Sequence, residues 1–150
     1  MKTAKAFGLP IVHSTINVAT GRGQPTVPEL ADNPPIDRTT TNAWEDAKFV
    51  AAVRATGRRK LIACALWTEI CMAFPALDAL REGYDVYPVV DAIGGTSDES
   101  HRAGLKRVIQ AGGRPVGWVA LAVELQRDWA RKETVADVIE IVLTERLLRA

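Results

Sequence analysis

The chain has 150 residues, of which 47% are hydrophobic and 25% charged, a composition typical of one globular domain with a packed core. Its 19 basic and 18 acidic residues leave a net charge of +1 without a basic stripe, which argues against nucleic acid as a partner. No apolar run exceeds seven residues and no signal-peptide pattern follows Met1, so we expect a cytoplasmic protein with reduced thiols and no membrane partner.

The predicted elements begin with residues 1–7, which have the pattern of the last turns of a helix that Gly8 ends. A loop is expected over residues 20–35, which are rich in Gly, Pro and Asn. Nearly continuous apolar runs, typical of strands buried on both faces of a parallel sheet, predict the strands. These runs are residues 9–16, 60–66, 84–92 and 114–121, with a weaker extended piece at 34–39.

Helices are expected between and after these strands. Asn42 and Glu45 form a capping-box pattern for a helix over residues 42–56, and Thr96 with Glu99 forms another for residues 96–111. Further helices are expected over residues 68–82, over part of residues 119–132, and after a cap at Thr134 with Asp137. The last helix carries an apolar face made of Val135, Val138, Ile139 and Val142.

The alternation of strands and helices predicts an α/β fold for a single domain, residues 1–150. We expect three αβα layers around a doubly wound, mostly parallel sheet. In such sheets, chemistry takes place beyond the carboxyl ends of the strands, where loops lead into helices.

Cys71 lies at such a place, because a strand ends near Leu66 and Thr68 suits the N-cap position of the next helix. Unpaired backbone N–H groups and the helix dipole favour a thiolate there and could hold an oxyanion. Pro75 lacks the N–H that would bond the Cys71 carbonyl, which loosens the turn. The alternative is that Cys71 is a small buried hydrophobic residue, a description that fits Cys64 in the apolar strand better.

Several motifs point to one family. They are LWTEICMAFPAL at residues 66–77, EGYDVYPVVDA at residues 82–92, RTTTNAW at residues 38–44 and ELQRDW at residues 124–129. In this order, and over about residues 2–129, they resemble the isochorismatase-like cysteine hydrolases, a superfamily that includes the nicotinamidases, and within it the YcaC-like subgroup.

The resemblance implies that Cys71 is the nucleophile, which attacks a carbonyl or related electrophilic carbon and forms a covalent intermediate. Leu66 and Trp67 match a pair joined by a cis peptide bond, which would aim backbone N–H groups, that of Cys71 included, at an oxyanion. Arg38 matches the position of the superfamily's catalytic lysine and would stabilise the thiolate electrostatically. Without the resemblance, Arg38 would be interpreted as a solvated loop charge.

The resemblance also makes Asn42, Trp44 and Phe74 candidates for the wall of a substrate pocket. Their alternative roles are a helix cap for Asn42 and core packing for the two aromatic residues. The two histidines, His13 and His101, lack metal-ligand spacing; we expect the first in the core and the second on a helix surface. We therefore expect neither a metal nor a cofactor.

The chain departs from the family at its start. The superfamily's base is an aspartate at the end of a first strand that precedes the helix matched by residues 1–7. We therefore expect an N-terminally truncated domain, with a gap in the sheet between the strands at residues 9–16 and 60–66. Asp37 and Glu69 are nearby acids, but strand alternation and the helix dipole account for them without a catalytic role.

Three interpretations of this departure stay open. The chain is a fragment or mis-started product of a working enzyme, a partner chain or rearranged sheet fills the gap, or a shortened paralogue folds without catalysing. The leading hypothesis is a hydrolase that acts on a small-molecule substrate with an amide or related C–N bond, within a homo-oligomer that the resemblance implies. The alternative is a catalytically inactive structural or interaction subunit.

Overall fold

The computed structural model describes residues 1–148, with side chains placed through residue 144. Short strands alternate with helices along the described chain, as the apolar runs predict. The elements are α1 (Lys2–Ala6), β1 (Ser14–Ile16), η1 (Pro28–Leu30), β2 (Ile36–Arg38), η2 (Ala43–Glu45), α2 (Ala47–Ala55), β3 (Lys60–Ala63), η3 (Thr68–Met72), α3 (Ala73–Arg81), β4 (Asp85–Pro88), α4 (Asp98–Gln110), α5 (Trp118–Gln126) and α6 (Lys132–Leu148).

The strands form two separate parallel pairs. In the first pair β1 lies beside β2, with Ser14 opposite Ile36, so the weak extended piece at residues 34–39 does contain a strand. In the second pair β3 lies beside β4, with Lys60 opposite Asp85. The strand expected over residues 114–121 is reduced to a single bridge between Val116 and Val89, because the chain turns into α5 directly afterwards.

Among the described residues β3 has a ladder partner on one edge only, which is β4. The Asp85 N–H donates to the carbonyl of Arg59, directly before β3, and the Val89 N–H donates to the Ala63 carbonyl, so Arg59 and Ala63 face β4. Backbone groups of alternate residues point to opposite edges of a strand, so those of Ile62 point away from β4. No ladder joins β1 to β3 within the described chain, in agreement with the gap expected between residues 9–16 and 60–66.

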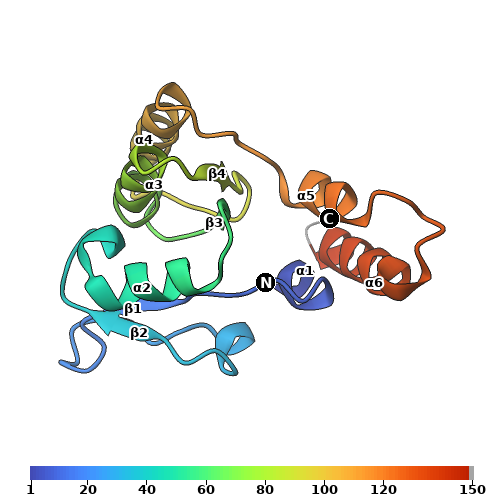
Figure 1. Ribbon diagram of the computed structural model, residues 1–150, viewed down its shortest axis with the longest axis horizontal. Helices are drawn as coiled ribbons and strands as arrows, with labels where there is room; N and C mark the ends of the chain where they lie inside the picture. Colours follow the sequence, from blue (N-terminus) through green and yellow to red (C-terminus); the bar gives the residue numbers. More distant parts are fainter. Residues whose placement is uncertain (149–150) are drawn as a thin grey trace.

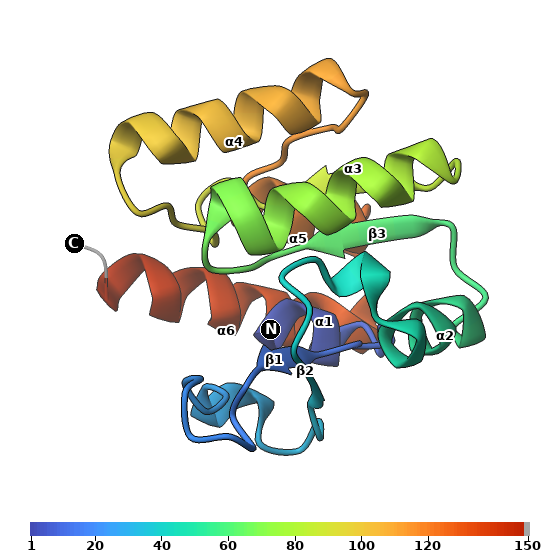
Figure 2. The same cartoon turned by 90° about the vertical axis from the view of Figure 1, so that its left-hand side faces the viewer.

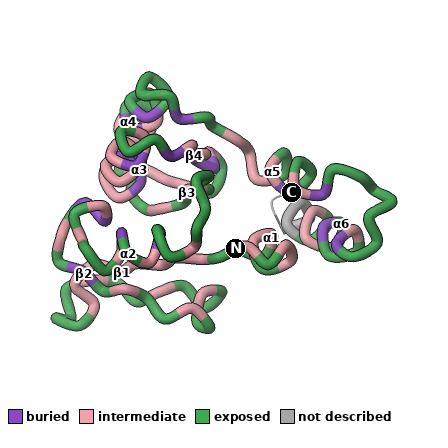
Figure 3. Tube along the Cα trace, viewed as in Figure 1, coloured by how far each residue is buried: buried purple, intermediate pink, exposed green. Residues whose placement is uncertain are grey.

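Helices lie on both sides of the β3–β4 pair. Figure 1 shows α3 and α4 on one side and α1, α5 and α6 on the other, and in Figure 2 α3 and α4 lie above β3 in the view. Buried segments gather around α3, β4 and α4, as the purple stretches of Figure 3 show. The core there consists of Val53, Met72, Ala73, Ala76, Ala79, Tyr84, Val86 and Val108.

Two of the expected helix caps are wrong by one or a few residues. Asn42 caps the short turn η2, whereas α2 begins after Asp46, whose carboxylate accepts the Phe49 N–H at 2.9 Å. Ser97, rather than Thr96, caps α4 by accepting the Ser100 N–H at 3.1 Å. Both corrections have one cause, since several residues that can serve as caps stand in a row and the packing of the helix selects among them.

The C-terminal helices also differ from the prediction. Thr134 lies inside α6 rather than at its start, and its hydroxyl donates to the Gln126 side chain at 2.5 Å. Val138 is completely buried, but Ile139 is 46% exposed and so does not belong to the buried face. No helix among the described residues combines the length and apolar content needed to cross a bilayer.

Candidate active site

Cys71 lies on a helical turn that follows the carboxyl end of β3. The chain leaves β3 at Ala63, passes through a cis peptide bond between Leu66 and Trp67, and enters η3 at Thr68. The cis bond occurs where the family resemblance implies one. Cys71 is partly buried, and η3 continues without a break into α3, so the thiol sits near the start of one helical segment over residues 68–81.

The turn that carries Cys71 is π-helical, since the Met72 N–H reaches five residues back to the Trp67 carbonyl at 3.2 Å. Directly after this turn, the α-helical bond from residue 75 to the Cys71 carbonyl is missing, because Pro75 has no N–H. Such single π turns occur frequently at functional sites.

The turn is held from outside by the segment that leads into α4. The Glu69 carboxylate accepts two bonds from Thr96, one from the N–H at 3.0 Å and one from the hydroxyl at 2.6 Å. The hydroxyl of Thr68, which is completely buried, lies 2.9 Å from Nδ1 of His101. His101 is therefore not a free surface residue, contrary to the expectation from the sequence.

Arg38 lies at the end of β2 and is 5% exposed. Its guanidinium donates to the Ser14 hydroxyl at 3.3 Å, to the Thr41 carbonyl at 3.0 Å and to the Thr40 carbonyl. Within the described chain no hydrogen bond joins it to Cys71, and its hydrogen-bond partners there are neutral oxygens. The alternative interpretation of Arg38 as a solvated loop charge is therefore wrong, because Arg38 is a buried cation.

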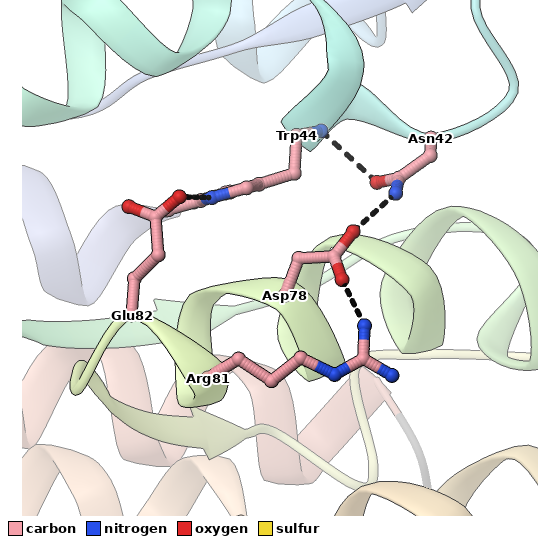
Figure 4. A network of polar contacts seen from close by, with 5 residues as sticks. All are labelled: Asn42, Trp44, Asp78, Arg81 and Glu82. Carbon is pink, nitrogen blue, oxygen red and sulfur yellow. Dashed lines mark hydrogen bonds and ion pairs between the residues drawn. The ribbon is translucent and has the colours of Figure 1, made fainter.

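The candidate pocket-wall residues are tied to α3 (Figure 4). Asn42 accepts the Trp44 N–H at 3.0 Å and donates to the Asp78 carboxylate at 2.7 Å, while the Trp44 indole donates to Glu82 at 2.9 Å. Phe74 and Asn42 line one shallow hollow beside α3, and Cys71 is not among the residues that line it. Asn42 thus acts as a cap, and Trp44 also packs edge-on against Phe49 and Tyr84.

The two acids that could stand in for a base are already engaged. Asp37 accepts the Ala19 N–H at 2.9 Å, the Thr15 hydroxyl at 2.8 Å and the Val18 N–H at 3.1 Å, which lower the pKa of its carboxyl. The bonds from Thr96 lower the pKa of Glu69 in the same way. Each carboxylate is therefore a poor proton acceptor, because the N–H and hydroxyl groups that bond it stabilise its charged form.

Other ionisable groups do not cluster. Among the described residues no three His, Cys, Asp or Glu side chains come together as a metal site would require. The His13 ring bonds the Thr26 hydroxyl at 2.8 Å and the Asn33 carbonyl at 3.3 Å, which anchors the long loop. Cys64 is exposed as a residue rather than buried in a strand, yet neighbouring atoms desolvate its thiol and raise its pKa.

The contacts of Thr96 and His101 were not expected from the sequence, although Gly104 carries a signal for them. A glycine inside an otherwise regular helix often marks a close approach of another backbone. A Cβ at Gly104 would stand 2.5 Å from the Cα of Glu69, so only glycine lets α4 pack this closely on the cysteine turn.

Comparisons with known proteins agree with these features. A family model described as the isochorismatase domain matches residues 1–119. The chain is 44% identical over 131 residues to "Probable hydrolase YcaC" of Escherichia coli (strain K12), which covers 84% of this chain and 62% of that protein. The chain thus spans less than two thirds of that relative's length.

Two solved structures share the fold over nearly the whole chain. The Escherichia coli YcaC gene product, described as an octameric hydrolase of unknown specificity, aligns with a TM-score of 0.83 and 36% identity over 98% of this chain and 78% of its own. YcaC from Pseudomonas aeruginosa, solved with hexane-2,5-diol and covalent acrylamide, aligns with a TM-score of 0.82 and 32% identity over 95% of this chain and 77% of its own.

Proposed function

Because the chain belongs to the isochorismatase family, we propose that it is a hydrolase in which Cys71 attacks the electrophilic carbon of a small amide or a related C–N bond. The Cys71 thiolate adds to the carbonyl carbon and gives a tetrahedral oxyanion. The C–N bond then breaks, the leaving amine takes a proton from solvent water, and a thioester remains. Water hydrolyses the thioester to the carboxylic acid and returns the thiol, so the reaction needs no cofactor.

The position of Cys71 carries this proposal. A sulfur near the start of a helical segment, directly beyond the carboxyl end of a parallel strand, lies at the positive end of the helix dipole. This end of the dipole favours the thiolate, and we propose that the Cys71 N–H helps to bind the oxyanion. The Pseudomonas aeruginosa relative carrying covalent acrylamide supports a nucleophilic centre, because acrylamide is an electrophile that thiolates add to.

Arg38 is proposed as the electrostatic partner of the thiolate. In the described chain the buried Arg38 guanidinium donates only to neutral oxygens, and burying a cation without a directly bonded anion is costly. An anion formed during the reaction would supply that compensation. Arginine stays protonated throughout, so its role is to stabilise charge rather than to carry a proton.

Self-association is a second part of the proposal. The C-terminal helices and the segment between them expose large apolar side chains, and a relative of the same fold is octameric. The exposed side chains are Val119, Val123, Trp129, Ile139 and Leu143. We propose that they lie in an interface between copies of the chain, which light scattering tests against the 16.3 kDa mass of one copy.

Hydrolysis of a panel of small amides, followed by product formation, tests the proposed reaction. Wild-type protein and the Cys64→Ser variant should release acid and amine at similar rates, whereas Cys71→Ser should fall to background. Cys64→Ser is the matched control because it removes the other thiol. Equal activity in both variants would overturn the nucleophile, and inactivity of the wild type on every amide would favour the structural subunit.

A further inference from the structure

Two pairs of polar contacts join the cysteine turn to the segment that starts α4, and the proposed reaction does not use them directly. One pair is Glu69 with Thr96, bonded at 3.0 and 2.6 Å. The other is Thr68 with His101, at 2.9 Å. Glu69 and Thr68 stand two and three residues before Cys71, so both pairs act on the turn that holds the sulfur.

We propose that these two pairs form a clamp that positions the Cys71 turn, which makes Thr96 and His101 positioning residues for the nucleophile. The inference rests on the proposed function of Cys71. The turn needs external support because Pro75 cannot complete its internal hydrogen bonding. The Thr68 N–H is likewise bonded outside the helix, to the Gly94 carbonyl at 2.7 Å.

The loop before α4 and α4 itself pack closely against the cysteine turn. A Cβ at Gly95 would lie 2.8 Å from the Glu69 carboxylate and 2.8 Å from the His101 backbone N. A Cβ at Gly104 would lie 2.5 Å from the Glu69 Cα. Glycines at these two positions let the loop and α4 contact the turn without intervening side chains, so a change at Thr96 is transmitted to the turn rather than absorbed.

The clamp affects the chemistry by fixing where the Cys71 sulfur lies relative to the start of the helix. The positive end of the helix dipole stabilises a thiolate only while the sulfur stays close to that end, because the effect falls off within one helical turn. Releasing the clamp lets the turn relax toward other hydrogen-bond patterns. The pH midpoint for reaction of Cys71 should then rise, by about 0.5 pH unit for loss of a helix-terminus interaction.

The test measures the rate at which iodoacetamide alkylates Cys71 and Cys64 in the same folded sample, by peptide mass spectrometry across a pH series. Thr96→Val removes the hydroxyl bond to Glu69 from an exposed position. It should raise the Cys71 midpoint and leave Cys64 unchanged, while Thr96→Ser should restore the wild-type midpoint. Thr68→Val, which breaks the second pair, should act in the same direction.

Ser97→Ala is the matched control, since Ser97 caps α4 beside Thr96 but does not touch Glu69. This variant should weaken α4 without moving the Cys71 midpoint. A clamp is ruled out if Thr96→Val and Thr68→Val leave Cys71 at its wild-type midpoint, or if Ser97→Ala shifts it equally. If wild-type Cys71 reacts no faster than Cys64, the proposed nucleophile itself fails, which is a separate outcome.

Discussion

At the scale of single residues, Arg38 is a buried cation that we propose as the electrostatic partner of the Cys71 thiolate. It is 5% exposed and its described partners are neutral. Arg38→Gln keeps hydrogen-bonding capacity and removes the charge, so it should raise the pH midpoint of Cys71 reactivity by about 1 unit. Arg38→Lys should stay close to wild type. Equal midpoints for Gln, Lys and wild type would show that the guanidinium does not act on the thiol.

The hydrogen bonds of Asp37 lead to a prediction about stability rather than catalysis. Bonds from the Ala19 N–H, the Thr15 hydroxyl and the Val18 N–H lower the pKa of its folded-state carboxyl. The stabilisation from the charged form is therefore complete above the unfolded value, about 4, and is lost as pH falls through the lower folded value. Urea midpoints measured downward from pH 5 should fall less in Asp37→Asn than in wild type. Parallel curves would contradict the role of this carboxylate.

At the scale of elements, the residue that caps α2 in the structure differs from the residue that the sequence pattern predicts. Asp46 accepts the Phe49 N–H, whereas the pattern in the sequence pairs Asn42 with Glu45. Asp46→Ala should lower the free energy of unfolding by about 1 kcal/mol, as loss of an N-cap does. Glu45→Ala, the matched control on an exposed neighbour, should have almost no effect in urea denaturation. If Glu45→Ala lowered the free energy of unfolding more than Asp46→Ala does, the capping box of Asn42 and Glu45 would be the actual cap.

The elements also show what a sequence can and cannot specify here. The apolar runs locate β3 and β4, and the weak extended piece at residues 34–39 correctly marks β2. The run at residues 114–121 misleads, since an apolar helix such as α5 and an apolar strand share the same composition. The contacts of Thr96 and His101 with the cysteine turn depend on how α4 packs, and Gly104 marks a close approach without identifying the partner.

For the site, the strand-to-helix position of Cys71 can be predicted from the sequence, whereas the contacts of the candidate pocket-wall residues cannot. Asn42 bonds to Asp78 on α3 and Trp44 bonds to Glu82 directly after α3, contacts that span more than thirty residues of chain. Long-range pairs of this kind are set by tertiary packing and override local interpretations.

At the scale of the whole molecule, the division of the sheet into two pairs is the main feature. Ile62 lies on the inner edge of β3 and is 40% exposed, while the Val89 N–H bonds the Ala63 carbonyl within the pair. The Ile62 amide should exchange with solvent deuterium much faster than the Val89 amide, because its edge has no ladder partner in the described chain. Equal protection in hydrogen-exchange NMR would mean that another strand covers this edge.

The central claim is that Cys71 is the nucleophile, and acrylamide addition tests it most directly. Wild-type protein is treated with acrylamide near neutral pH, and the modified peptides are followed over time by mass spectrometry. The adduct should form on Cys71 well before Cys64, whose thiol pKa is raised by desolvation. Modification of Cys64 first, or equal slow modification of both thiols, would contradict the account.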